Sequence, residues 1–169
     1  ARELTRYDIK VMLIDKEHDV GMHASSRNDG EIHPGIDLLK GQVKQKYNSR
    51  GNVMYDQICK DLDVRFSRPG QYLCFNKKYY KLIFSIARLY WKAMGIPTEY
   101  MNADKLRKKI PGISNAINGG VYFPTAGIVS PYELVIAYAE NAVDNSAVIA
   151  LDTAVTGMEI SNNKIVSLK

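Results

Sequence analysis

The residues whose types and spacing could do chemistry lie between positions 11 and 35. Val11–Ile14 form a short apolar run that ends in Asp15, and the loop that follows carries hydroxyl, guanidinium, amide and imidazole groups. An apolar run of this length is typical of a strand that is covered on both faces of a parallel sheet. An acid at the carboxyl end of such a strand is placed to accept hydrogen bonds from a ribose. The segment therefore indicates nucleotide-cofactor chemistry.

Two observations keep a second interpretation open. In dinucleotide-binding folds a glycine-rich phosphate turn lies about twenty residues before this acid, and no such turn precedes Asp15. Residues 1–8 are typical of the end of a helix, so we expect the sequence to be a fragment in which the turn is missing. A buried strand that ends in an acid also occurs in many α/β proteins, and a plain structural strand is the alternative at this point.

The loop after the strand contains Ser25, Ser26, Arg27 and Asn28, whose side chains could line the path of a pyrophosphate and a flavin. An ordinary polar loop is the alternative. His33 is flanked by Pro34 and Gly35, a context that suits contact with a flat cofactor or with a substrate's proton. A lone histidine is nevertheless more often structural than catalytic, because catalytic histidines are recognised by their partners.

Composition narrows the class of protein. Of the 169 residues, 46% are hydrophobic and 24% charged, which is ordinary for a globular protein. No apolar run approaches the roughly 18 residues of a membrane span, and no signal peptide is visible. The net charge of +5 comes from scattered lysine clusters, so we expect no nucleic-acid surface. Cys59 and Cys74 lack any metal-ligand spacing, which predicts no metal site and two reduced thiols in a cytoplasmic protein.

The periodicity of apolar residues predicts the elements in the first half of the chain. We expect a strand at 10–15, a helical turn near 24–27 and a helix over 41–62 whose packed face holds Val43, Tyr47, Met54, Ile58 and Leu62. Two short strands, 64–67 and 71–75, flank Pro69 and Gly70, which indicates a hairpin. A helix over 79–94 should pack through Ile83, Ala87, Tyr90 and Met94, and Trp91 is assigned to packing as well.

The second half carries clear helix-capping signals. Asn102 is predicted to cap a helix that runs through Lys109, and a strand is expected over 120–124. Ser130, Pro131 and Glu133 form a capping-box pattern for a helix to about Asp144, whose apolar face is predicted to hold Leu134, Ile136, Ala137 and Val143. Strands at 148–151, 154–160 and 164–168 follow, the last two joined by Asn162 and Asn163 in a tight turn. The order predicts an α/β fold with an inserted α+β section.

Four segments resemble a known family: ARELTRYDIKVMLIDKEHDVG, ASSRNDGEIHPG, GNVMYDQICKDLDVRFSRPGQYLCF and FPTAGIVSPYELVIAYAENAV. They are similar to flavin-dependent oxidoreductases of the D-amino acid oxidase superfamily, in particular to anaerobic-type glycerol-3-phosphate dehydrogenases and L-2-hydroxyglutarate oxidases. The resemblance covers nearly the whole chain, and its most specific part is RNDGEIHPG. It implies an incomplete Rossmann-like FAD-binding domain, residues 1–62 and 130–169, and part of a substrate domain, residues 63–129.

The resemblance also implies roles for individual residues. Asp15, with Lys16 beside it, resembles the acid that holds the adenosine ribose, and His33 and Gly35 resemble the pair at the flavin ring. The resemblance assigns the loop along the pyrophosphate and flavin to Ser25, Ser26, Arg27 and Asn28, and the main-chain contact with adenine to Val155. Asp15 replaces the family's usual glutamate. Asp29 and Glu31 add negative charge where many relatives are neutral, which bears on the substrate, because acids facing an anionic substrate would repel it.

The implied activity is oxidation of a secondary alcohol by hydride transfer to FAD, with His33 as the candidate for proton handling. Glycerol 3-phosphate is the expected substrate, and L-2-hydroxyglutarate is the alternative. The residues that clamp the substrate would lie in a later, absent part, so we expect the fragment alone to be inactive. A module that keeps the fold but binds no cofactor remains a competing hypothesis. A nicotinamide-dependent enzyme is the third hypothesis, and it is less favoured because it would give the loop with Asn28 and His33 no role. The resemblance leaves open an electron acceptor, a partner subunit and peripheral membrane association.

Overall fold

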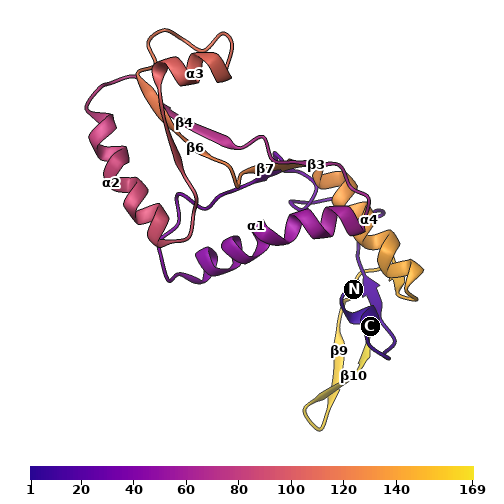
Figure 1. Ribbon diagram of the computed structural model, residues 1–169. Coiled ribbons are helices and arrows are strands. Elements are labelled where there is room, and N and C mark those ends of the chain that lie inside the picture. Colours follow the sequence, from indigo (N-terminus) through magenta and orange to yellow (C-terminus); the bar gives the residue numbers. More distant parts are fainter. The chain divides into compact units, whose positions relative to one another are not determined.

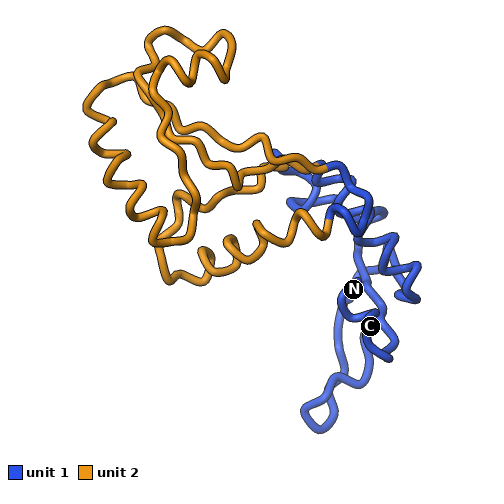
Figure 2. Tube along the Cα trace, in the orientation of Figure 1, with its two compact units in different colours: residues 1–29, 59–65, 130–169 blue, residues 30–58, 66–129 orange.

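The computed structural model describes residues 1–169, which separate into two compact units (Figure 2). Unit 1 comprises residues 1–29, 59–65 and 130–169, and unit 2 comprises residues 30–58 and 66–129. The predicted domains, 1–62 with 130–169 and 63–129, assign cofactor and substrate roles to parts of the chain and stay a prediction. No helix has both the length and the apolar character needed to cross a membrane.

Helices and strands alternate along most of the chain (Figure 1). The helical elements are η1 (Leu4–Arg6), α1 (Val43–Asp61), α2 (Tyr80–Ala93), α3 (Ala103–Lys109) and α4 (Pro131–Asp144). The strands are β1 (Met12–Ile14), β2 (Glu31–Ile32), β3 (Phe66–Ser67), β4 (Gln71–Phe75), β5 (Glu99–Asn102), β6 (Gly119–Phe123), β7 (Gly127–Val129), β8 (Val148–Ala150), β9 (Met158–Ser161) and β10 (Lys164–Leu168).

In unit 1, β1 and β8 form a parallel pair whose register runs from Met12 opposite Val148 to Ile14 opposite Ala150. The predicted strand before Asp15 is thereby confirmed. Its predicted burial on both faces is wrong, because Met12 is 61% exposed. A sheet of two strands is too narrow for both faces to be covered along their length.

Unit 2 contains two antiparallel sheets of three strands, ordered β4-β6-β5 and β2-β7-β3. The predicted hairpin between 64–67 and 71–75 is wrong, because β3 pairs with β7 while β4 pairs with β6. Gly70, at φ +76°, donates its N–H to the main-chain oxygen of Ala126 at 3.2 Å. The Pro69–Gly70 signal therefore marks a passage of the chain from one sheet to the other.

The core of unit 2 lies between α2 and the β4-β6-β5 sheet, where Trp91, Ile96, Val121 and Phe123 are buried. The packing role of Trp91 is confirmed, and its Nε1 donates to the main-chain oxygen of Ile36 at 3.0 Å. The predicted α2 stripe is half right. Ala87 and Met94 pack against the core, whereas Ile83 and Tyr90 are exposed, because the helix turns its larger rings, Phe84 and Trp91, inward.

The long helix is present as α1, but its predicted packed face is only partly right, because Ile58 and Leu62 are half-buried and the three other positions are not. Val43, Tyr47 and Met54 are exposed, and the buried positions are Asn52 and Cys59. The inward face of α1 is selected in part by hydrogen bonds that Asn52 makes, which an analysis of apolar spacing does not detect.

The predicted cap of α3 is confirmed, since Asn102 accepts a hydrogen bond from the Lys105 N–H at 2.9 Å. At the start of α4, Ser130 accepts from the Glu133 N–H at 3.4 Å. The second half of the predicted capping box is wrong. The Glu133 carboxylate instead binds Arg65, whose guanidinium holds the pKa of Glu133 below its usual value.

Two predictions near the end of the chain also differ from the structure. Ile136 and Val143 of α4 are exposed, and Ala142 is the buried position on that helix. The predicted strand 154–160 is the shorter β9, while the turn at Asn162 and Asn163 is confirmed, with φ angles of 51° and 58°.

Candidate functional site

The first group of candidate residues follows β1 in unit 1 and is held by Asp15. The Asp15 N–H donates to the oxygen of Ala150 at 2.9 Å, which fixes the residue at the end of the parallel pair. One carboxylate oxygen of Asp15 accepts from the Glu17 N–H at 3.0 Å. This side chain therefore stands at the carboxyl end of β1 in a defined position, as a ribose-binding acid requires.

The turn that follows depends on a close approach at Gly21. This residue has φ +70°, and a Cβ atom there would lie 2.1 Å from Oγ of Ser26 and 2.9 Å from Cγ1 of Val135. Both the backbone conformation and the space thus require glycine. The approach brings the turn against α4.

The predicted pyrophosphate loop is stabilised by bonds within itself. The N–H groups of Ser26 and Arg27 both donate to the His23 oxygen at 3.2 Å, which forms the predicted turn. Arg27 Nε donates to the Met22 oxygen at 2.8 Å, and Asn28 Nδ2 donates to the Ala24 oxygen at 2.9 Å. These side chains hold the loop in shape, and Ser26 is buried.

A cavity of about 380 Å³ lies within unit 1 beside Asp15 and Ser25. Most of its wall is apolar. The apolar wall includes Leu13, Val20, Val135, Tyr138, Ala139, Ala142 and Ile149, and the first three residues, Ala1, Arg2 and Glu3, also line the cavity. An apolar cavity with a few polar groups at its edge is the usual environment of a small-molecule ligand. The apolar walls could cover a base, and the Asp15 carboxylate could accept a hydrogen bond from a ribose hydroxyl.

The structure brings Asp15 and Ser25 together in this cavity, but other predicted cofactor residues do not line it. Lys16 lies beside Glu17 instead, with its Nζ 3.6 Å from the carboxylate. Val155 is exposed on the segment before β9, and Ser26 faces Gly21. The α4 wall was missed by sequence reasoning. Its signal was present as Val135, Tyr138, Ala139 and Ala142, one face of a helix at the spacing i, i+3, i+4, i+7.

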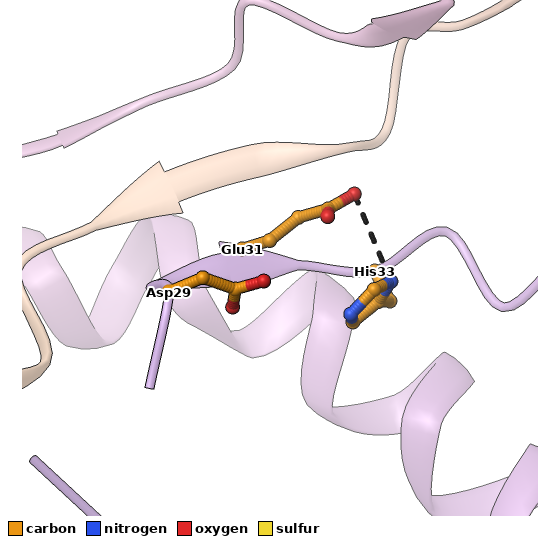
Figure 3. Close-up of side chains that lie close together, drawn as sticks. All are labelled: Asp29, Glu31 and His33. Carbon is orange, nitrogen blue, oxygen red and sulfur yellow. Dashed lines mark ion pairs between the residues drawn. The ribbon is translucent and has the colours of Figure 1, made fainter. Parts of the chain in front are cut away.

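The second group of candidates is the segment after β2, in unit 2. His33 exposes about half of its side chain, and its Nδ1 lies 3.7 Å from a carboxylate oxygen of Glu31 (Figure 3). Asp29 precedes the strand. The imidazole is thus accompanied by acids on the same short segment, and it is accessible to a ligand.

A buried polar network fixes the backbone at His33. Asn52 is 7% exposed, and its Nδ2 donates to the main-chain oxygens of His33 at 2.9 Å and of Thr125 at 3.0 Å. Arg68 donates in turn to the Asn52 main-chain oxygen at 2.7 Å and to its Oδ1 at 3.2 Å. Asp56 completes the network through Arg68, whose guanidinium lowers the pKa of the Asp56 carboxyl.

Gly35 is required for a similar reason to Gly21. Its φ is +85°, and a Cβ atom would lie 2.5 Å from Oδ1 of Asn48. The segment 33–35 is therefore pressed against α1. Sequence reasoning missed Asn48, Asn52 and Arg68; the only signal was the occurrence of asparagines, which are rare inside helices, on the middle of α1.

Comparison with known proteins places these features in a family. The family model described as FAD dependent oxidoreductase matches residues 1–169. A glycerol 3-phosphate dehydrogenase of Caloramator mitchellensis is 39% identical over 94% of this chain and 33% of its own length. An L-2-hydroxyglutarate dehydrogenase of Escherichia coli K12 is 28% identical over 94% of this chain and 37% of its own length. The chain thus spans about a third of the curated relatives it matches.

Solved structures agree on the fold. Glycine oxidase of Bacillus cereus superposes with a TM-score of 0.84 at 22% identity, covering 99% of this chain and 46% of that one. The L-α-glycerophosphate oxidase of Mycoplasma pneumoniae, solved with FAD bound, gives 0.82 at 21% identity, covering 93% and 42%. The predicted α/β fold is confirmed as part of this architecture. With the family model matched along its whole length, the chain belongs to the FAD-dependent oxidoreductases.

Proposed function

We propose that this chain is part of an FAD-dependent dehydrogenase that oxidises the secondary alcohol of glycerol 3-phosphate. The observation that carries the proposal is the apolar cavity of unit 1, in which Asp15 stands at the end of a parallel strand. The choice of substrate is supported by the 39% identity to the Caloramator glycerol 3-phosphate dehydrogenase, against 28% to the Escherichia coli L-2-hydroxyglutarate dehydrogenase.

In this proposal each candidate residue of the chain has its own role. Asp15 binds the adenosine ribose, and the loop of Ser25 to Asn28 borders the rest of the cofactor. His33 takes the proton of the substrate hydroxyl, for which its exposed imidazole is suited. The bound flavin supplies the hydride acceptor. Asn52 and Arg68 keep His33 in place through its main-chain oxygen.

Oxidation of L-2-hydroxyglutarate is the second candidate, supported by several relatives with that name. The substrates differ in their anionic group, a phosphate in one case and a second carboxylate in the other. The acids Asp29 and Glu31 disfavour either anion close to His33. The phosphate of glycerol 3-phosphate, or the carboxylate of L-2-hydroxyglutarate that is remote from the hydroxyl, is therefore expected to lie away from this segment. The other carboxylate of L-2-hydroxyglutarate is bonded to the carbon that is oxidised and would stay close to His33.

The experiment is purification of the whole gene product that carries this sequence, followed by release of its cofactor and assay with an artificial electron acceptor. We expect yellow protein that releases FAD and oxidises glycerol 3-phosphate at the higher kcat/KM. A higher kcat/KM for L-2-hydroxyglutarate would replace the proposed substrate. Protein that stays colourless after reconstitution with excess FAD would establish the cofactor-free module instead.

Variants test the residues separately. Asp15→Ala should weaken FAD binding about tenfold to a hundredfold, because hydrogen bonds to a charged acceptor contribute about 1.5–3 kcal/mol, whereas Lys16→Ala should leave it unchanged. His33→Gln should lower kcat about a hundredfold or more while FAD stays bound. His18→Gln, another exposed histidine, is the matched control. Equal rates for the two histidine variants would remove His33 from the proposed chemistry.

A further inference from the structure

Three metal-ligating side chains lie together on the short segment that contains β2. Asp29, Glu31 and His33 each offer one ligand atom, and these atoms lie within 4.8 Å of one another (Figure 3). The expectation of no metal site rests on the spacing of Cys59 and Cys74 and does not extend to this segment. The three side chains are therefore a candidate metal site that the sequence analysis did not consider.

The backbone that carries two of these ligands is fixed by the rest of unit 2. Glu31 and Ile32 pair with β7, and the His33 oxygen accepts a hydrogen bond from Asn52 at 2.9 Å. Ile32 is only 4% exposed, so its neighbours in this extended segment, Glu31 and His33, project to the opposite side. A metal ion would thus meet ligands whose backbone is already ordered, which lowers the entropy cost of binding.

The distance between these two ligands fits a small divalent ion. Zn²⁺ lies about 2.0–2.2 Å from an imidazole nitrogen or a carboxylate oxygen, so two ligands of a tetrahedral ion are about 3.4 Å apart. Nδ1 of His33 is 3.7 Å from Oε1 of Glu31, which is close to that value. This Oε1 atom is buried, and burial strengthens its attraction for a cation. Asp29 is exposed, so a rotation of its side chain can complete the set.

The chemistry of the three ligands selects the class of ion. Mg²⁺ and Ca²⁺ take oxygen ligands, whereas an imidazole nitrogen together with carboxylates suits divalent transition metals such as Zn²⁺. Two carboxylates balance the charge of a divalent ion. Three protein ligands also leave the fourth position of a tetrahedral ion open to water.

We propose that Asp29, Glu31 and His33 bind one divalent transition-metal ion of the Zn²⁺ class, and that this ion reversibly inhibits the oxidation. Binding stands on the three ligands alone, whereas inhibition rests on the proposed function of His33. In a neutral imidazole one nitrogen carries the proton and the other accepts. With the metal on Nδ1, the proton stays on Nε2, so the ring cannot take the proton of the substrate hydroxyl.

The first test is equilibrium dialysis of the FAD-loaded whole gene product against Zn²⁺. We expect the parent to bind one Zn²⁺ that the double variant Asp29→Asn, Glu31→Gln binds at least about tenfold more weakly. Glu17→Gln is the matched control, because it removes the carboxylate that lies 3.0 Å from Nε2 of another histidine, His23, and it should bind Zn²⁺ as the parent does. Mn²⁺ should bind the parent more weakly than Zn²⁺ does. Equal Zn²⁺ affinity in the parent and the double variant would overturn the site and leave the acids as ion-pair partners of His33.

The second test is the effect of Zn²⁺ on the rate. Saturating Zn²⁺ should lower kcat about tenfold or more in the parent and in Glu17→Gln, because the base is lost, while the double variant keeps its rate. A chelator should restore the rate, and the flavin absorbance should stay unchanged throughout, which shows that FAD is not displaced. Zn²⁺ that binds without lowering kcat would overturn the inhibition and remove His33 as the base. If the gene product oxidises neither alcohol, the proposed function fails, and dialysis still decides the metal site.

Discussion

The two segments that carry the candidate residues are built in different ways. The turn from Gly21 to Asn28 in unit 1 is held mainly by hydrogen bonds between residues three to five apart, such as those of Arg27 and Asn28. The segment at His33 in unit 2 is held from a distance, by Asn52 and through it by Arg68. A self-contained turn can be recognised in its own sequence, while a segment held by distant side chains cannot.

The largest expected difference between the two segments is in the cost of removing an asparagine. Asn52→Ala should lower the free energy of unfolding by about 2 kcal/mol, because it removes the shorter of two amide bonds to the His33 oxygen, one of two bonds to the Thr125 oxygen, and the side-chain acceptor of Arg68. Asn28→Ala removes exposed local bonds and should cost less than about 1 kcal/mol. Urea denaturation of the two variants measures both values. A larger loss for Asn28→Ala would reverse the comparison.

The second prediction concerns one glycine in each of the two segments, and we expect a similar loss of stability when either is replaced. Gly35→Ala and Gly21→Ala should each destabilise the chain by about 1 to 3 kcal/mol, since both combine positive φ with a blocked Cβ position. Gly51 in α1 is the control, because nothing lies within 4 Å of its Cβ position. Gly51→Ala should stabilise by about 0.5–1 kcal/mol. Thermal unfolding measures the Tm of the three variants. Only Gly51→Ala should have a higher Tm than the parent.

The smallest effect is the pH dependence of the Arg68 network. Arg68 lowers the pKa of Asp56 in the folded chain, so the pair contributes stability above the unfolded pKa of about 3.9 and loses it as the pH falls through the lower, folded value. Asp56 is largely exposed, so we expect the contribution to stay below about 1 kcal/mol. Urea midpoints at pH 7 and pH 3 should differ more for the parent than for Asp56→Asn; equal differences would contradict the assigned role.

Elements whose signals are local could be predicted from the sequence. The caps at Asn102 and Ser130, the Asn162–Asn163 turn and the strand before Asp15 all follow from neighbouring residues, and all are present. Predictions that depend on a distant partner failed: Glu133 binds Arg65 rather than the start of its own helix, and β3 and β4 join different sheets.

The same difference between local and distant signals separates the residues of the candidate site that were predicted from those that were not. Asp15 and Ser25 were found because an acid at a strand end and a polar loop are local patterns, and they line one cavity with α4. Asn52 and Arg68 were not found, because their partners His33 and Thr125 are 19 and 57 residues away, respectively. The predicted packed face of α1 failed at Val43, Tyr47 and Met54 for the same reason, since the buried amide of Asn52 faces inward on that part of the helix.

The hairpin of β9 and β10 has a consequence for handling the protein. Every residue of both strands is exposed, and Ile160, Ile165 and Leu168 are among them. A ribbon of two strands without a covering layer gains little from burial and presents unpaired main-chain groups along both edges. We expect this ribbon to exchange its amide hydrogens first and to seed aggregation in concentrated samples, so a lysine at position 165 should improve the solubility of the isolated chain.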